Sequence, residues 1–329
     1  IDFSVNSNPF GPPPGIRKAF QKVSIKRYPD RDSWALRQAL ADHHQLTPDR
    51  ILPGNGSLEL LWMLALSYFR KGDRVLILTP TFGEYARSAR LMGARVDTLP
   101  ADPADGFLHR RDAVRARLEA NAYRAVFLCT PNNPTGTVIP PERLESWACG
   151  FPETIFVIDE AYLNFAPQAS TALDIPAENL LVLRSMTKDY ALAGLRLGYA
   201  VGHSGVIRAL SRARAPWNVN AYAQAAGTNA LQMTPLVQKQ IQRTLQAKDT
   251  LTAGLEKLGY AVVNSAVHYF LLEVERAPAF REHLFQFGLQ VRDCTSFGLP
   301  RHVRIAARKP EENQRLLDML TQEPFPTGN

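Results

Sequence analysis

The sequence predicts an α/β fold with a large domain built on a mainly parallel sheet and a smaller α+β domain. Short apolar runs that end in polar residues alternate with helical patterns over the first two thirds of the chain. After about Pro235 the pattern changes to a long polar helix followed by strands of alternating polarity. The 329 residues also exceed the usual size of one domain, about 50–250 residues. We therefore predict a large domain over residues 30–235 and a small domain formed by residues 1–29 and 236–329.

Four apolar runs are expected to be strands that are buried on both faces. They are "RVLILTP" (74–80), "AVFLCTPNNP" (125–134), "IFVIDEAY" (155–162) and "LLVLRSMTK" (180–188). Helical patterns lie between them, from Glu84, from Leu108 and from Pro141 to Gly150, and a further apolar helix follows "PGNGS". Strands that alternate with helices form parallel sheets with helices on both faces.

The last third of the chain predicts a smaller α+β unit. A helix over roughly residues 236–258 precedes two alternating strands, "YAVVNS" (260–265) and "HYFLLEV" (268–274). A helix near 278–287, the segments "LQVRDC" (289–294) and "HVRIAAR" (302–308), and a helix from Pro310 complete it. The proline-rich segment "NPFGPPPG" (8–15) is expected to pack near this unit.

Composition excludes several classes of protein. A hydrophobic content of 45% and a charged content of 21% are typical of a folded globular chain. No apolar stretch approaches the ~20 residues of a membrane helix, and residues 1–20 lack the pattern of a secretory signal. Three separated cysteines predict neither a disulfide framework nor a zinc site, so a reducing cytoplasm is expected.

The net charge of +7 raises the possibility of nucleic-acid binding, but no DNA- or RNA-reading motif accompanies the dispersed basic residues. A surplus of arginine also suits phosphorylated small molecules. The seven histidines show no metal-ligand spacing, so no metal is predicted.

Polar and aromatic residues follow each of the four apolar runs. Ligands bind outside the carboxyl ends of the strands in open parallel sheets, so these residues are expected to meet in one crevice. Phe82 and Tyr85 follow the first run, Asn133 the second, Asp159 and Tyr162 the third, and Lys188 the fourth.

The chemistry of these side chains suits pyridoxal 5'-phosphate. A partly desolvated lysine such as Lys188 has a lowered pKa and forms a Schiff base with an aldehyde. The buried carboxylate of Asp159 would keep the ring nitrogen of this cofactor protonated. Tyr162 and Asn133 would donate to its phenolate oxygen, and Phe82 would face the ring.

The cofactor phosphate requires backbone N–H groups at a helix start together with a cation. Gly56, Ser57 and Leu58 would supply the N–H groups and Arg196 the cation, while Ser185 and Thr187 would add hydroxyl groups. Each residue alone has an ordinary alternative, since a lone lysine after a strand is usually solvated and Gly and Asn also mark turns. The joint pattern favours the cofactor site.

Three motifs carry a resemblance to a known family: "PNNPTG" (131–136), "DEAY" (159–162) and "SMTKDYALAGLRLGY" (185–199). They resemble the fold-type-I aminotransferase superfamily, in the branch that holds histidinol-phosphate aminotransferase and threonine-phosphate decarboxylase of cobalamin biosynthesis. The resemblance covers nearly the whole chain and implies a PLP-dependent transferase fold. It implies that Lys188 is the cofactor lysine, that Asp159 and Tyr162 are catalytic, and that Arg196 anchors the phosphate.

The resemblance also assigns residues that the local pattern does not. Tyr28, in "KRYPD", matches a tyrosine that reaches the cofactor phosphate of the neighbouring subunit, which implies a homodimer with shared sites. Arg304 matches the arginine that binds a substrate carboxylate or an equivalent anion, and Arg292 matches a second cation of members with phosphorylated substrates. Asn8 resembles an asparagine near the substrate. From the sequence alone, both arginines could equally be solvated charges at strand ends.

Two reactions fit the same cofactor residues, because the bond that breaks at the substrate Cα decides the enzyme. The segments "RYPDRDSWALRQALADHHQL", "FLCTPNNPTG", "APWNVNAYAQAAG" and "VRIAARKPEENQRLLDML" resemble threonine-phosphate decarboxylase more closely. We therefore expect a lyase that decarboxylates L-threonine O-3-phosphate or a related amino acid. The alternative is an aminotransferase of the histidinol-phosphate type.

Overall fold

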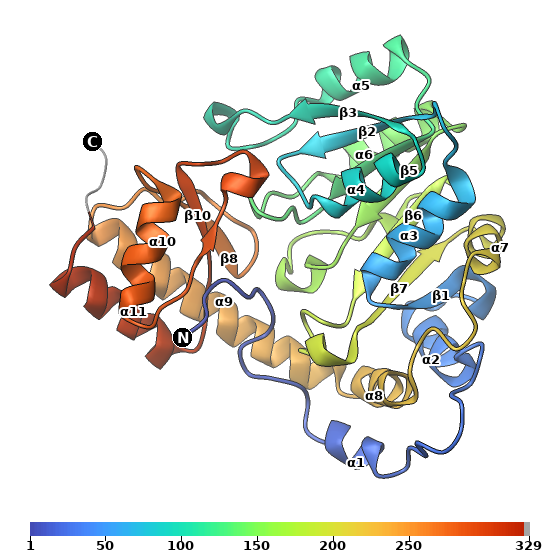
Figure 1. The fold of residues 1–329 in the computed structure, drawn as a ribbon, viewed down its shortest axis with the longest axis horizontal. Coiled ribbons are helices and arrows are strands. Elements are labelled where there is room, and N and C mark those ends of the chain that lie inside the picture. The colour runs from blue at the N-terminus through green and yellow to red at the C-terminus, as the bar shows by residue number, and fades with distance from the viewer. Residues whose placement is uncertain (326–329) are drawn as a thin grey trace.

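The computed structural model describes residues 1–325 and contains two sheets. A seven-stranded sheet has helices on both faces, and a three-stranded antiparallel sheet lies beside it (Figure 1). Both units and the mixed α/β class agree with the predicted fold. Among the described residues, none of the helices combines the length and the apolar character that crossing a membrane requires.

The large sheet has the order β1-β7-β6-β5-β4-β2-β3. The four predicted strands are confirmed as β2 (Arg74–Thr79), β4 (Ala125–Cys129), β5 (Ile155–Asp159) and β6 (Leu180–Ser185), which run parallel with β3 (Arg95–Pro100). Two further strands, β1 (Ile51–Asn55) and β7 (Leu197–Gly202), extend the sheet, and β7 is antiparallel to both of its neighbours.

The strands alternate between two apolar cores because successive side chains of a strand point to opposite faces. Phe127 packs in one core with α3 (Ser57–Tyr68) and α4 (Glu84–Leu91), whereas Val126 packs in the other with α5 (Arg111–Ala120) and α6 (Pro141–Gly150). Every residue of β4, β5 and β6 is buried, as the continuous apolar runs predicted, and every residue of β7 is buried as well.

A third core lies under β1 and β7. It includes residues of α2 (Trp34–His44), α8 (Ala221–Leu231) and the start of α9 (Thr234–Lys257), together with Ile16 from the short helix α1 (Ile16–Phe20). Helix α7 (Ser204–Arg212) follows β7 and packs against α3.

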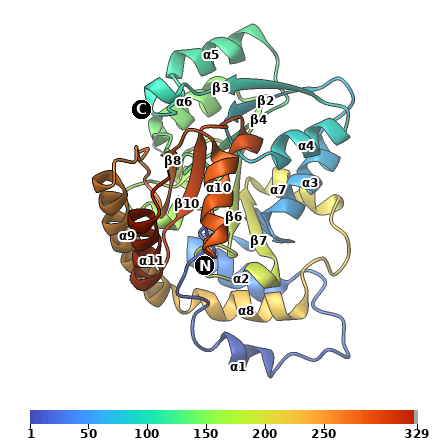
Figure 2. The ribbon, with the colours of Figure 1, turned by 60° about the vertical axis from the view of Figure 1, so that its left-hand side comes forward.

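The small unit is built on β8 (Tyr269–Glu273), β10 (His302–Ala306) and β9 (Arg292–Asp293), in that order. The helices α9, α10 (Ala277–Gln286) and α11 (Pro310–Gln322) lie around it (Figures 1 and 2). Phe3 is buried in this core, whereas Ile16 belongs to the core of the large unit. Two residues of segment 1–29 therefore pack in different cores, and the proposed domain boundary stays a prediction.

The predicted strand over residues 260–265 was wrong. Val262 makes one isolated bridge with Leu272, and the chain then leaves the sheet. The N–H of Ala266 donates to the carbonyl of Gly136, so this segment is tied to the large unit instead. The expected strand over residues 289–294 is reduced to the two residues of β9.

The antiparallel direction of β7 brings its first residues to the edge where the parallel strands end. Gly198 lies opposite Ser185 of β6, and Leu197 lies opposite Asn55, the last residue of β1. The start of α3 approaches β7 so closely that a Cβ atom on Gly198 would lie 2.5 Å from the N atom of Ser57 and 2.9 Å from the O atom of Arg184. Both neighbours are backbone atoms of packed elements, so only glycine fits here.

Replacement of Gly198 by alanine should therefore destabilise the protein. Overpacking of this kind costs about 1–3 kcal/mol in free energy of unfolding, measured by denaturant titration. Gly150→Ala is the control, because a Cβ atom at that helix end meets no atom within 4 Å. Equal stability of the two variants would show that α3 moves away from β7 without cost.

Candidate active site

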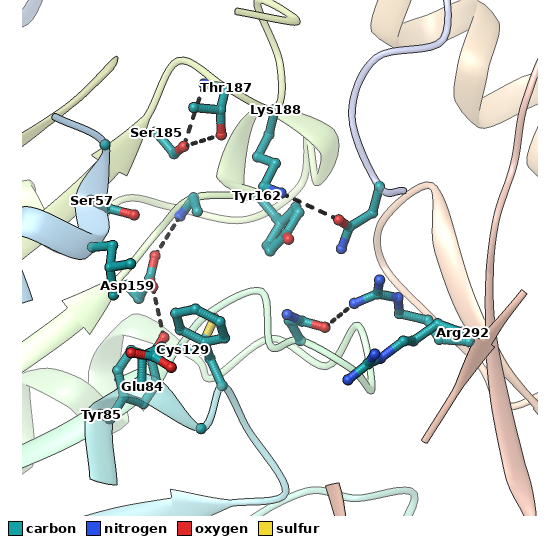
Figure 3. A pocket seen from close by; sticks show the side chains of 18 of the residues that line it. Ser57, Glu84, Tyr85, Cys129, Asp159, Tyr162, Ser185, Thr187, Lys188 and Arg292 are labelled. Carbon is teal, nitrogen blue, oxygen red and sulfur yellow. Dashed lines mark hydrogen bonds between the residues drawn. The ribbon is translucent and has the colours of Figure 1, made fainter. Parts of the chain in front are cut away.

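A cavity of about 590 Å³ lies at the carboxyl edge of the large sheet, between it and the small unit (Figure 3). The structure brings eleven of the predicted cofactor residues into its wall. These are Gly56, Ser57, Leu58, Phe82, Asn133, Asp159, Tyr162, Ser185, Thr187, Lys188 and Arg196. Arg292 and Arg304 also line it, from the small unit.

Lys188 follows β6 and points into the cavity (Figure 3). Its Nζ atom donates to Oδ1 of Asn6 at 3.4 Å and lies 5.7 Å from the ring centre of Tyr162. Burial lowers the pKa of Lys188 to about 8, and the positive charges of Arg304 and Arg196 act in the same direction. A substantial fraction of the amine is therefore neutral in weakly alkaline solution and able to attack a carbonyl carbon.

Asp159 ends β5 and is 6% exposed. Burial raises the pKa of this carboxyl, and three contacts oppose that rise: the hydroxyl of Tyr85, the N–H of Ala161 and the charge of Lys188. Tyr85 donates to Oδ2 at 2.7 Å and Ala161 to Oδ1 at 3.0 Å. A carboxylate held in this way suits a cationic N–H group in the cavity.

The first turn of α3 forms an anion-binding end of the cavity. Gly56 precedes the helix with a φ of 77°, and no side chain caps the free N–H groups. A Cβ atom on Gly56 would lie 2.9 Å from Nη2 of Arg196, so the absence of a side chain lets the guanidinium approach. The hydroxyl groups of Ser185 and Thr187 lie 2.7 Å apart beside it. Helix N–H groups, a guanidinium and hydroxyl groups together suit a phosphate.

Between these ends lie Phe82, Tyr162 and Asn133. Phe82 meets Tyr85 edge to face, with ring centres 5.6 Å apart. Burial raises the pKa of Tyr162, which keeps its hydroxyl protonated as a hydrogen-bond donor. The carbonyl oxygen of Asn133 accepts a hydrogen bond from Nη1 of Arg304.

The two arginines of the small unit differ in their surroundings. Arg304 is 5% exposed, and its Nη2 donates to the carbonyl of Ser4 at 2.7 Å. Its Nε atom is buried without a partner among the described residues, which leaves a donor for an incoming anion. Arg292 is exposed, and its Nη2 donates to the hydroxyl of Ser296 at 2.8 Å.

Two predicted site residues lie outside this cavity wall. The amide of Asn8 donates to the carbonyl of Asp189 and to Gln240, so Asn8 supports the chain around Lys188 and Asn6 takes the place in the cavity. The spacing of "NSN" would have allowed either asparagine. Tyr28 is 79% exposed and stacks on Trp217, at 4.6 Å between ring centres.

Residues that the sequence motifs did not assign also line the cavity. Ser4, Asn6 and Cys129 could not be found from motifs, because only the fold brings the amino-terminal segment and the end of β4 to Lys188. Tyr85 was noted beside a strand end, but its hydrogen bond to Asp159 became visible only in the structure. No group of three or more His, Cys, Asp or Glu residues that could hold a metal occurs within the described part of the chain.

The cavity fits pyridoxal 5'-phosphate by the chemistry of its parts. One wall of the cavity contains the buried carboxylate of Asp159, the amine of Lys188 with a pKa of about 8, and the uncapped start of α3 beside Arg196. These groups match the ring nitrogen, the aldehyde and the phosphate of the cofactor. The fold and the site thus define a PLP-dependent enzyme.

Comparison with known proteins gives the family. The chain belongs to the family of aminotransferases of class I and II, whose sequence model matches residues 1–320. It is 37% identical to a histidinol-phosphate aminotransferase from Symbiobacterium thermophilum over 326 residues, which cover 97% of this chain and 89% of that protein. The cofactor of the present protein is pyridoxal 5'-phosphate, and its fold is that of the fold-type-I enzymes.

Two solved structures have the same fold. A histidinol-phosphate aminotransferase from Sinorhizobium meliloti in complex with pyridoxal 5'-phosphate superposes with a TM-score of 0.90 at 24% identity, over 98% of this chain and 89% of that chain. An L-threonine-O-3-phosphate decarboxylase from Porphyromonas gingivalis superposes with a TM-score of 0.87 at 26% identity, over 98% of each chain.

Replacement of Lys188 by alanine should abolish the covalent attachment of the cofactor. The visible absorption of the lysine-bound cofactor should disappear, and reduction with borohydride should no longer fix the cofactor to the chain. Lys248→Ala is the control, because Lys248 is a half-buried lysine outside this cavity. An unchanged spectrum of the Lys188 variant would place the attachment at another lysine.

Proposed function

We propose that this protein is an aminotransferase whose amino donor is a phosphorylated amine of the histidinol-phosphate type. The observation that carries the proposal is the pair of arginines across the cavity from Lys188, together with the names of the relatives. Eight relatives that are 30–37% identical over almost the whole chain are histidinol-phosphate aminotransferases. The comparisons thus favour the alternative over the decarboxylase that the sequence motifs favoured.

The residues of this chain would divide the work as follows. Gly56, Ser57, Leu58 and Arg196 hold the cofactor phosphate, and Asp159 holds the protonated ring nitrogen. When bound, the cofactor supplies an electron sink for the bond that breaks at the substrate Cα. Tyr162 and Asn133 hydrogen-bond its phenolate oxygen.

Lys188 is the proton carrier of this scheme. Its lowered pKa of about 8 leaves a usable fraction of neutral Nζ. The neutral amine accepts the proton from the substrate Cα, as general bases do when their pKa lies near the working pH. In a decarboxylase the bond from Cα to the carboxyl group would break instead, and Lys188 would have no proton to accept in this step.

The excess of positive charge in the cavity favours an anionic substrate. Four cations, Lys188, Arg196, Arg292 and Arg304, line it together with only two carboxylates, Asp159 and Glu84. The cofactor phosphate uses Arg196, which leaves Arg304 and Arg292 for the substrate. We assign the phosphate group of the substrate to these two residues, since guanidinium groups bind phosphate oxygens in pairs.

Tyr28 supports the proposal of a homodimer with shared sites. Its side chain is largely exposed and stacks on Trp217, and it lies outside the cavity wall of its own chain. In a dimer of the family type it would approach the cofactor phosphate of the second chain.

The reaction is tested by product analysis. The cofactor-loaded protein is incubated with L-histidinol phosphate and 2-oxoglutarate, and products are identified by mass spectrometry. Formation of glutamate together with the ketone of the substrate supports the proposal. Release of carbon dioxide from O-phospho-L-threonine without a need for the keto acid, and no glutamate from histidinol phosphate, would replace it by the decarboxylase.

Arg304→Lys should lower kcat/KM for the phosphorylated substrate by about 10–100-fold, because lysine keeps the charge but loses the paired donors. Arg301→Lys is the matched control: Arg301 precedes the same strand, but its guanidinium is mostly exposed and pairs with Glu273 outside this cavity. The kcat/KM of both variants for the phosphorylated substrate is measured by steady-state kinetics and compared with the wild type. An equal kcat/KM of the Arg304 variant and the wild type would show that the anion binds elsewhere.

A further inference from the structure

Tyr85 contacts both Asp159 and Phe82, which are expected to face the cofactor ring, and the family motifs give Tyr85 no role. It is 1% exposed and lies in the first turn of α4, three residues after Phe82. Its hydroxyl donates to Oδ2 of Asp159 at 2.7 Å, and the edge-to-face contact of its ring with Phe82 holds that side chain in place.

The position of the Tyr85 hydroxyl is fixed by packing. The ring stacks on Phe127, with ring centres 5.5 Å apart and an angle of 12° between planes. The backbone carbonyl of Tyr85 accepts a hydrogen bond from the hydroxyl of Ser88 at 3.1 Å. A tyrosine held on two sides presents its hydroxyl in one place, so its donor is pre-organised for Asp159.

Asp159 needs such a donor because its surroundings oppose its negative charge. Burial is the main cause that raises the pKa of this carboxyl. Besides Tyr85 and Lys188, the titratable groups near it are the Cys129 thiol on β4, the neighbouring Glu160 and the hydroxyl groups of Tyr162 and Tyr269. Lys188 is the cation that acts on it, and a lysine bound to the cofactor no longer supplies a full ammonium charge. The hydroxyl of Tyr85 and the N–H of Ala161 then remain to stabilise the carboxylate.

The two donors also orient the carboxylate. Each oxygen of Asp159 accepts one hydrogen bond, Oδ1 from Ala161 and Oδ2 from Tyr85. A carboxylate oxygen has more than one lone pair, so both oxygens keep acceptor capacity for a third donor from the cavity. Removal of the Tyr85 hydroxyl would free the plane of the carboxylate to rotate.

We propose that Tyr85 is a positioning residue for the cofactor ring: its hydroxyl keeps Asp159 ionised and oriented, so that the carboxylate holds the ring nitrogen in its protonated form. This inference rests on the cofactor site of the proposed function, but not on which substrate or which bond is cleaved. It predicts that the contribution of Tyr85 to cofactor affinity depends on the ring nitrogen.

The experiment compares two ligands on three proteins. The protein, freed of cofactor, is titrated with pyridoxal 5'-phosphate and with its 1-deaza analogue, in which C–H replaces the ring nitrogen. The test variant is Tyr85→Phe, which keeps the ring contacts with Phe127 and Phe82. The matched control is Tyr123→Phe. Tyr123 lies just before β4 and outside the cavity, and its hydroxyl donates a hydrogen bond to Asp97 at 2.8 Å.

We expect Tyr85→Phe to raise the Kd of pyridoxal 5'-phosphate by about tenfold, the size typical of a hydrogen bond to a charged group. The Kd of the deaza analogue should stay within about twofold of the wild type, because that ligand has no ring nitrogen for Asp159 to bind. Tyr123→Phe should change neither constant. If Tyr85 had only a structural role, Tyr85→Phe would raise the Kd of both ligands by the same factor.

If Tyr85→Phe raised the Kd of both ligands equally, or of neither, the inference would be overturned, while the assignment of the cofactor site would stand. Failure of the wild type to bind either ligand would overturn the cofactor site as well. Circular dichroism and the thermal midpoint of each variant separate a loss of fold from a loss of affinity.

Discussion

Lys188 is half-buried and Asp159 is buried at the same edge of the sheet, and the rest of the site offsets the cost of removing these two charges from water. Desolvation lowers the pKa of the amine and raises that of the carboxyl, so each group is displaced toward its neutral form. The neutral amine is the reactive form of Lys188. Asp159 is useful only as a carboxylate, and the donors on its two oxygens offset part of its desolvation.

The excess of cations in the cavity extends the same electrostatic argument to ligands. Arg304 is almost completely buried, and two of its nitrogens already donate to Asn133 and to the carbonyl of Ser4. These contacts hold the guanidinium in place before a ligand arrives, which reduces the entropy lost on binding. The contact with Ser4 also makes the amino-terminal segment part of the site wall. The cavity wall around Arg304 is therefore formed by the small unit and the first residues of the chain as well as by the large sheet.

Much of the fold and half of the site could be predicted from local sequence. Continuous apolar runs gave β2, β4, β5 and β6, because strands buried on both faces need apolar residues at every position. The residues after these runs had to lie at one edge, since parallel strands end on the same side. The edge strand β3 was missed because it is partly polar, and β1 and β7 were missed because they contain glycine, and β1 also proline. The expected strand at 260–265 alternates in polarity, but its chain leaves the sheet after one bridge.

By itself, the sequence determined the cofactor of this protein, because a lysine, a carboxylate and a glycine-bearing helix start, each ordinary alone, together form a recognisable pattern. Only the tertiary structure decided which asparagine of "NSN" faces Lys188 and that Tyr85 donates to Asp159. Those contacts join segments 182 and 74 residues apart, and no local periodicity encodes the direction of such side chains. The meeting of Gly56 with Arg196 likewise depends on the antiparallel insertion of β7 and on the space left by Gly198.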